Sequence, residues 1–185
     1  MFDKRKQQVL SKKDNSKKGS LDKAIQPLID ILNKQDDYFT TSSCAGRISV
    51  IGITADSRKD KAGWLYKTHD AADTDKVWDS IQDTDRSLAY WFRMEPAMLH
   101  VACRDIEAAF SLLQKVRAAG LKRSGIISKK AAVTVEIVGT ERINALAVKQ
   151  GQLLITKEYL RSLIEEANEK LKQTRHKIKK LEKLI

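Results

Sequence analysis

Apolar residues recur with two different periods along the chain, and each change of period marks a change from helix to strand. A period near 3.6 predicts helices over residues 3–13, 73–82 and 106–119, and from about Lys157 to the end. Alternating or β-branched runs predict strands at residues 47–54, 63–69, 87–94, 97–104, 125–128, 132–138, 143–148 and 153–155. This order predicts an α+β fold, with a mixed, mostly antiparallel sheet covered by helices.

Two helices carry clear boundary signals. Ser20 is a plausible N-cap for an apolar pattern that runs to Leu32, and Pro27 within it predicts either a kink or the start of a second short helix. Asp105 is expected to cap the next long helix, which Gly120 ends. The apolar face predicted for that helix consists of Ile106, Ala109, Phe110, Leu113 and Val116.

The C-terminal segment, residues 157–185, predicts one long helix with a heptad seam. Spacings of four and three alternate along Leu160, Ile164, Ala167, Leu171, Thr174, Ile178, Leu181 and Ile185. At 1.5 Å per residue the helix spans roughly 43 Å, which is longer than one small core requires. We therefore expect its distal half to pack on the basic N-terminal helix or on another subunit, so self-association through this helix is an open alternative.

Length and composition favour a single domain over residues 1–185, with a basic N-terminal segment at 1–23. No apolar run approaches 18 residues and the N-terminus lacks a signal-peptide pattern, so neither membrane insertion nor secretion is expected. The two cysteines and three histidines have no zinc-site spacing, so we assign no metal and expect a cytoplasmic protein.

The net charge of +11 is concentrated at the two ends of the chain. Residues 1–23 hold eight Lys/Arg against three Asp, residues 170–185 hold seven against one Glu, and the remainder is balanced. Basic ends on a neutral body favour binding of a polyanion, although well-solvated helices would show the same charge. A membrane surface is less attractive, because neither end adds bulky aromatic anchors.

The segment TTSSCAGRI, residues 40–48, places four hydroxyls, a thiol and Arg47 before a strand. As a loop it could cradle an anion or cofactor, but on residue types alone a turn whose hydroxyls bond local backbone is the commoner structure. The RSG turn at residues 123–125 has the same two interpretations. No glycine-rich dinucleotide or Walker motif follows any strand, which argues against a Rossmann-type site, and Ser42 and Ser43 lack the G-x-S-x-G context of a hydrolase.

The histidines and tryptophans are weaker signals. His100 lies in an apolar strand, where a hydrogen-bonded core histidine is commoner than a base, although an imidazole can exchange protons near neutral pH. His69 ends a strand and His176 lies among lysines. Trp64, Trp78 and Trp91 could stack on a base, but tryptophans at these spacings are more often core residues.

Taken in order, several segments resemble one family. They are LSKKDNSKKGSLD (10–22), TTSSCAGRI (40–48), WLYKTH (64–69), EPAMLHVACR (95–104), RSGI (123–126) and LLITKEYL (153–160), followed by an Ala-Asn-x-Lys helix (167–170). This order closely resembles the tRNA wybutosine-synthesising methyltransferases, the third enzyme of the wybutosine pathway and its archaeal relatives. The resemblance covers nearly the whole chain. One departure is Leu146-Ala147, where the family pattern leads us to expect Pro-Leu.

The resemblance implies an enzyme that uses S-adenosylmethionine to methylate a ring nitrogen of the tricyclic guanosine derivative beside the anticodon of phenylalanine tRNA. It also implies a fold unlike standard methyltransferases. The alternative is a non-catalytic tRNA-binding module that uses the same basic ends, and a weaker one is a structural protein associating through the heptad seam. Only the enzyme requires a saturable site for the methyl donor.

The resemblance also suggests positions for the site. The donor would lie against Ser42, Ser43, Cys44, Ala45, Gly46, Ser124 and Gly125, with Arg47 or Lys129 meeting its carboxylate. The first choice of base is His100, the second is His69, and Ser43 is a further catalytic candidate. Contacts with tRNA are expected from Lys12, Lys17, Lys18, Ser20, Asp22, Lys172, Arg175, Lys177, Lys179 and Lys180.

Overall fold

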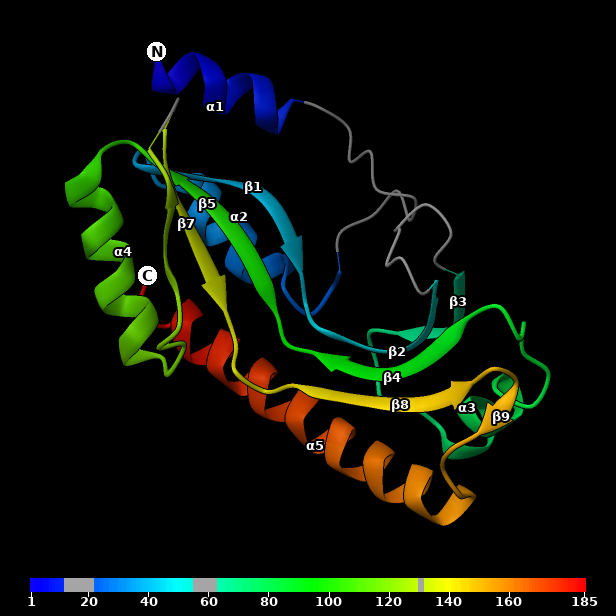
Figure 1. Cartoon of the computed structure of the whole chain (residues 1–185). Helices are drawn as coiled ribbons and strands as arrows, with labels where there is room; N and C mark the ends of the chain where they lie inside the picture. The colour runs from blue at the N-terminus through cyan, green and yellow to red at the C-terminus, as the bar shows by residue number, and fades with distance from the viewer. Residues whose placement is uncertain (12–21, 55–62, 130–131) are drawn as a thin grey trace. The chain divides into compact units, whose positions relative to one another are not determined.

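The computed structural model describes residues 1–11, 22–54, 63–129 and 132–185 (Figure 1). Along the chain the helices and strands are α1 (Phe2–Leu10), α2 (Gln26–Lys34), β1 (Tyr38–Cys44), β2 (Arg47–Ile53), β3 (Gly63–Thr68), α3 (Thr74–Ser80), β4 (Ala89–Glu95), β5 (Met98–Cys103), α4 (Ile106–Ala118), β6 (Gly125–Ser128), β7 (Val133–Val138), β8 (Ile143–Lys149), β9 (Gln152–Leu153) and α5 (Lys157–Glu182). These residues group into two compact units, each with its own antiparallel sheet.

The four-stranded unit comprises residues 1–45, 97–140 and 174–185. Its strand order is β1-β5-β7-β6, and every pairing is antiparallel. One face of this sheet is buried, because apolar side chains of alternate strand positions pack with those of α2, α4 and the end of α5. That core includes Leu28, Leu99, Leu112, Ile137, Ile178 and Leu181. The opposite face, called the outer face below, bears the polar strand residues.

The five-stranded unit comprises residues 46–96 and 141–173. Its strand order is β3-β2-β4-β8-β9, again antiparallel throughout. The inner face packs against α3 and the first part of α5, in a core that includes Ile48, Val50, Val77, Phe92, Met94, Leu160 and Ile164. Its outer face carries the remaining strand positions.

The predicted α+β class is confirmed, with two antiparallel sheets in place of one mixed sheet. Pro27 lies at the start of α2, so it begins a second helix instead of kinking a longer one. Asp105 caps α4 as expected by accepting a hydrogen bond from the Ala108 amide at 2.8 Å. The prediction of a single domain over 1–185 is not tested by the division into units and stays a prediction.

Three expectations from the sequence were wrong. Residues 40–44 form most of strand β1 and not a loop. Phe110 is 58% exposed, and the face of α4 that packs inward is centred on Leu112 instead. The distal half of α5 buries Ile178 and Leu181 in the core of the four-stranded unit, so its seam needs neither α1 nor another subunit. Self-association through α5 stays a prediction and would have to use its other faces.

No helix within the described part of the chain is both long enough and apolar enough to span a bilayer.

Candidate active site

A row of residues crosses the four-stranded sheet on its outer face. Ser42 of β1 lies opposite His100 of β5, His100 lies opposite Glu136 of β7, and Glu136 lies opposite Gly125 of β6. Residues directly opposite each other in antiparallel strands point to the same face with Cβ atoms about 5 Å apart. The register of three strand pairings therefore brings together residues from four separate segments.

Hydrogen bonds join three members of this row into a chain. The Ser42 Oγ lies 3.0 Å from the His100 Nδ1, and the His100 Nε2 lies 3.1 Å from the Glu136 Oε1. An ionised carboxylate can only accept, so the Nε2 must carry the hydrogen on that side. In the neutral imidazole the Nδ1 is then an acceptor, and the Ser42 hydroxyl donates to it. The lone pair that can take up a proton is thus on the Nδ1, beside Ser42.

The His100–Glu136 pair remains accessible to solvent. The two side chains are 30% and 33% exposed, so His100 is not the core histidine that its apolar strand favoured. An accessible imidazole held by a carboxylate on one nitrogen and by a hydroxyl on the other can act as a general base. The Ser42 hydroxyl can pass a proton to the ring when the substrate does not reach the Nδ1 directly.

Space for a ligand is present beside this chain. A Cβ placed on Gly125 would meet no heavy atom within 4 Å among the described residues, so the backbone next to Glu136 is open. Met98, which lies opposite Cys44, offers an apolar side chain that is 37% exposed. A carboxylate, a hydroxyl, an open backbone and an apolar side chain fit a cationic ligand that also has polar and apolar parts. The residues present are therefore compatible with a sulfonium donor.

Ser43 and Ser124 are not brought together. Ser43 lies opposite the buried Leu99, so its side chain points to the other face from Ser42. Ser124 is only 4% exposed, and its Oγ accepts a hydrogen bond from the Val138 amide at 3.1 Å. The strands β1 and β6 are the two edges of the sheet, three strand spacings or roughly 14 Å apart. A group touching both would have to span that distance.

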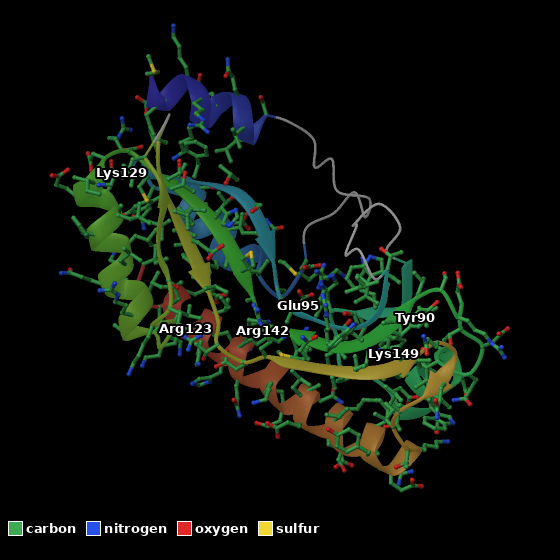
Figure 2. All side chains as sticks on the ribbon, viewed as in Figure 1. Tyr90, Glu95, Arg123, Lys129, Arg142 and Lys149 are labelled. Atoms are coloured by element: carbon green, nitrogen blue, oxygen red, sulfur yellow. The ribbon has the colours of Figure 1, made fainter. Side chains whose placement is uncertain are left out.

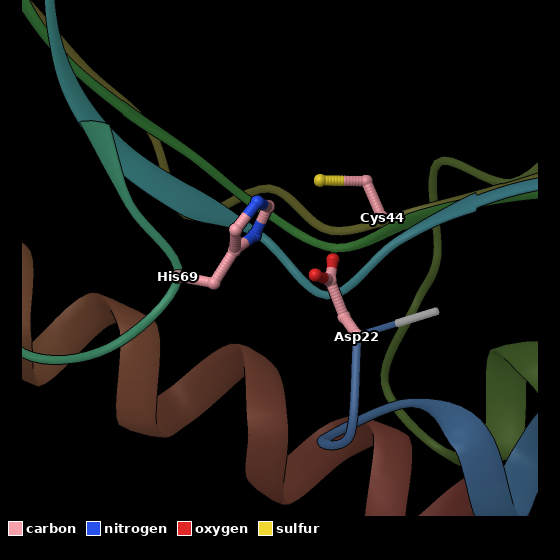
Figure 3. A group of neighbouring side chains, drawn as sticks. All are labelled: Asp22, Cys44 and His69. Atoms are coloured by element: carbon pink, nitrogen blue, oxygen red, sulfur yellow. The ribbon is translucent and has the colours of Figure 1, made fainter. Parts of the chain in front are cut away.

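The end of β1 is tied to the segment that precedes α2. The Ala45 amide donates to the Asp22 Oδ2 at 3.1 Å, and Ala45 is buried. Figure 3 shows the Asp22 carboxylate and the side chain of Cys44, the last residue of β1. Cys44 is half-buried, whereas Cys103 in β5 is fully buried, and desolvation raises the pKa of the Cys103 thiol to about 12. Of the two thiols, Cys103 is thus a core group and no nucleophile.

Gly46, Arg47 and His69 belong to the five-stranded unit. Gly46 has a φ of 87°, a backbone conformation that favours glycine, and its carbonyl oxygen lies 2.9 Å from the His69 Nδ1. The Arg47 Nε donates to the Glu95 Oε2 at 2.6 Å, and its guanidinium lies 4.8 Å from the centre of the Trp64 ring. The charge of Arg47 is therefore already paired with a carboxylate.

The predicted RNA contacts divide into three groups: Asp22, whose carboxylate is bonded to the Ala45 amide, a basic N-terminal group, and a group on α5. Lys12, Lys17, Lys18 and Ser20 lie outside the described residues. On α5, Lys179 and Lys180 are exposed, Arg175 and Lys177 are half-buried, and the Lys172 Nζ lies 3.6 Å from the Glu169 carboxylate. Lys129, which was predicted to meet the donor carboxylate, is exposed just after β6, and Figure 2 labels it together with Arg123 at the other end of that strand region.

Sequence reasoning missed Glu136. The available signal was a lone carboxylate in the β-branched run Val133–Val138, where a charged residue indicates an exposed face. Its pairing with His100 depends on the register between β5 and β7, which no local pattern reveals.

Comparison with known proteins gives consistent matches over nearly the whole chain. The model of a family described as Methyltransferase TYW3 matches residues 4–185. The chain is 38% identical over 183 residues to the tRNA(Phe) 7-((3-amino-3-carboxypropyl)-4-demethylwyosine(37)-N(4))-methyltransferase 1 of Pyrococcus furiosus, covering 98% of this chain and 92% of that protein. It is 35% identical over 177 residues to the tRNA wybutosine-synthesizing protein 3 homolog of Xenopus laevis, covering 94% and 70%.

Solved structures agree with these matches. The PH1069 protein from Pyrococcus horikoshii superposes with a TM-score of 0.91 at 34% identity, covering 100% of this chain and 96% of that one. A hypothetical protein from Aeropyrum pernix superposes with a TM-score of 0.72 at 26% identity, covering 89% and 99%.

Proposed function

This chain belongs to the Methyltransferase TYW3 family, and from that premise we propose the reaction that it catalyses. It is a methyltransferase, and the resemblance inferred from its ordered motifs is confirmed. The proposed reaction moves a methyl group from S-adenosylmethionine to a ring nitrogen of the tricyclic wybutosine precursor beside the anticodon of phenylalanine tRNA. The observation that carries this proposal is the nearly full-length match to relatives named as tRNA(Phe) 7-((3-amino-3-carboxypropyl)-4-demethylwyosine(37)-N(4))-methyltransferases. S-adenosylmethionine is proposed as the donor because methyltransferases generally use it.

Bound S-adenosylmethionine supplies a methyl group already activated on a sulfonium, so the protein chiefly has to position the reactants. Of the expected donor contacts, Ser42, Cys44 and Gly125 stay in the proposal. Ser43 and Ser124 suit it less, because Ser43 points to the other face and the Ser124 hydroxyl is bonded to the Val138 amide. Glu136 is added to the proposed contacts, because its carboxylate borders the open backbone at Gly125. Lys129 is now preferred over Arg47 for the donor carboxylate, since Arg47 is already paired with Glu95.

The chain of Ser42, His100 and Glu136 is proposed to remove the proton from the ring nitrogen. As the nitrogen–carbon bond forms and the carbon–sulfur bond breaks, the proton passes to the His100 Nδ1, directly or through the Ser42 hydroxyl. Glu136 holds the ring through the Nε2 hydrogen and stabilises the imidazolium that results. His69 remains the second candidate for the base, whereas Ser43 suits a catalytic role less, because its side chain points to the other face from Ser42.

The tRNA itself is proposed to contact the basic ends of the chain. Lys179 and Lys180 suit this role because they are exposed on the last turns of α5. Asp22 suits it less, since its carboxylate is bonded to the Ala45 amide. A cytoplasmic location and the absence of a bound metal stay predictions.

The test is a donor titration followed by a methyl-transfer assay. Calorimetry with S-adenosylmethionine should give one saturable site, and labelled methyl should enter tRNA that carries the unmethylated precursor at about one group per molecule. The same tRNA lacking the tricyclic precursor is the matched control and should stay unlabelled. Binding of tRNA without a donor site would instead favour the non-catalytic binding module.

A further inference from the structure

The outer face of the five-stranded sheet carries tryptophans and cations in register. Ile51 of β2 lies opposite Trp64 of β3 on one side and opposite Trp91 of β4 on the other. One row along, Ser49 lies between Lys67 of β3 and Arg93 of β4. Since opposite residues share a face, both rows point away from the core that α3 and α5 cover.

The charge on this face is predominantly positive. Among the described residues at its strand positions and at the start of β8, a single carboxylate, that of Glu95, accompanies five cations: Arg47, Lys67, Arg93, Arg142 and Lys149. Figure 2 shows Glu95 and Arg142 at one end of the sheet and Lys149 at the other end of β8. The face therefore carries an excess of positive charge along its whole length.

The tryptophan nearest the edge is accessible and close to cations. Trp64 is 43% exposed, which is unusual for a side chain of its size. The Arg47 guanidinium lies 4.8 Å and the Lys67 ammonium 5.7 Å from its ring centre. An indole held beside cations presents a π-surface on which a base can stack while a phosphate meets the charges.

The Ser49 side chain of the same row is completely buried. Its Oγ is buried and has no hydrogen-bond partner among the described residues, although buried hydroxyls are normally bonded. The side chains on either side, Lys67 and Arg93, are long cations. Lys67 is exposed and Arg93 half-buried, so these two side chains, and not Ser49, are the groups of this row that a phosphate can reach.

A hollow beside the same row suits a backbone phosphate or sugar. It has a volume of about 220 Å³ and is lined by Arg93, Glu95, Arg142, Ile143 and Asn144. Pockets for whole small molecules usually reach ~300–1,000 Å³, so this one is too small for a cofactor. The Arg93 Nε donates to the Asn144 Oδ1 at 3.0 Å, which orients the guanidinium at its rim.

We propose that this face binds unpaired nucleotides of the substrate tRNA. Trp64 and Trp91 stack on bases, while Lys67, Arg93 and Arg142 hold the phosphates between them. The bases of a double helix are stacked inside it, so a surface that binds a duplex needs only cations for the phosphates. Two indoles about 10 Å apart instead suit unstacked bases that point out of a loop. This inference rests on the proposed function, because the RNA it names is the substrate proposed there.

The test measures the affinity of the whole protein for a labelled single-stranded RNA with the anticodon-loop sequence. Trp64→Leu should raise Kd about 5- to 160-fold, the factor that corresponds to a base–aromatic stacking interaction of ~1–3 kcal/mol. Arg93→Gln should weaken binding and lower the slope of log K against log salt by about 0.7, one phosphate contact on a single strand. Neither effect should appear with a fully paired duplex of the same sequence.

Two matched variants serve as controls. Phe110→Leu removes an exposed aromatic and Arg117→Gln an exposed arginine, both from α4, and neither should change Kd. Wild-type affinity in Trp64→Leu and Arg93→Gln, or no binding of the single strand by the wild-type protein, would overturn the proposal. The assay needs no methyl donor. If RNA binds through this face but no methyl group is transferred, only the proposed reaction is rejected. If methyl transfer occurs but the variants bind RNA as tightly as the wild-type protein, only this RNA-binding surface is rejected.

Discussion

The outer faces of the two sheets differ in how their polar groups are bonded. On the four-stranded sheet a hydroxyl, an imidazole and a carboxylate bond to one another across three strands. On the five-stranded sheet cations outnumber carboxylates, and a buried hydroxyl has no partner within the described part of the chain. A group that exchanges a proton needs a partner that fixes its tautomer, whereas groups that hold a polyanion must keep their charge available. The bonding pattern, more than the residue types, therefore separates a reacting face from a binding face.

The largest effect that tests this difference between the two faces is expected for His100→Ala. If the four-stranded face does the chemistry, single-turnover methyl transfer at saturating RNA should fall about 100-fold or more, because a general base typically contributes 10²–10⁴. The Kd for RNA and for the methyl donor should stay near the wild-type value. Rapid-quench measurement of the rate, with the thermal midpoint of the same variant, checks both.

Glu136→Gln is the companion variant. It keeps an acceptor near the His100 Nε2 but removes the charge that stabilises the imidazolium, so the rate should fall, though less than in His100→Ala. A stably folded His100→Ala variant with near-normal turnover would contradict the assignment and make His69 the next base to test.

A second prediction compares one glycine from each sheet. A Cβ on Gly52 would lie 2.6 Å from the Tyr90 Cε1 and 3.0 Å from the Leu88 Cδ1, so Gly52→Ala should cost about 1–3 kcal/mol of unfolding free energy through overpacking. Gly125→Ala meets no atom within 4 Å, so its stability should change by less than ~0.5 kcal/mol. Urea denaturation of both variants measures this.

The Gly125 variant also reports on the donor site. If the open backbone beside Glu136 accepts the methyl donor, the added methyl group should weaken donor binding while the fold stays intact. Equal donor affinity in the wild-type protein and Gly125→Ala would show that the donor does not bind beside Gly125.

A third, smaller effect concerns the C-terminal helix. If Lys179 and Lys180 bind tRNA phosphates, replacing both with Gln should lower the slope of log K against log salt by about 0.7–0.9 for each phosphate that is no longer neutralised. Arg117→Gln, a cation on α4, should leave the slope unchanged. If the slope is unchanged in the double variant, the end of α5 does not bind phosphates and serves packing. The phosphates would then be bound by the outer face of the five-stranded sheet.

The smallest effect is expected at α1, which only the four-stranded unit carries. The Arg104 guanidinium donates to the Asp3 carboxylate at 2.7 Å and holds the pKa of Asp3 below its ordinary value. The stabilisation from this pair is then complete above the unfolded-state pKa near 4 and is lost as the pH falls through the lower folded-state value. Amide hydrogen exchange of α1 in the wild-type protein should quicken below about pH 4, relative to its rate in Asp3→Asn.

In Asp3→Asn the protection of α1 should depend less on pH over the same range, because no proton binds at residue 3. Identical pH dependence in the two proteins would show that α1 is held by apolar contacts, such as that between Phe2 and Phe39, whose ring centres are 5.1 Å apart.

Local signals in the sequence predicted much of the fold. Capping by Asp105, the helix start at Pro27 and the strands β2 and β3 each follow from residues that are close in sequence. The hydroxyl run of β1 was mistaken for a loop, because an edge strand with one solvated face tolerates polar residues of weak strand propensity.

The site depended on information that a single sequence does not contain. Placing Glu136 beside His100 requires the register of β7 on β5, and a slip of one residue would turn either side chain into the core. The tryptophans Trp64 and Trp91 were expected in the core, because pattern alone does not tell which face of a strand is solvated. Ordered motifs indicated the reaction, whereas the geometry that performs it required the strand pairings.

The seam of α5 contains one polar residue, Thr174, and it is completely buried. Its Oγ1 accepts a hydrogen bond from the Ala97 amide at 3.2 Å, immediately before β5 begins. A seam made only of aliphatic side chains could slide by a heptad along its groove with little change in its packing, since Leu and Ile interchange at similar volume. Any shift of α5 along its axis would instead leave the Ala97 amide without a hydrogen-bond acceptor. Thr174 thus fixes the register in which α5 packs, much as a single buried asparagine fixes the register of a coiled coil.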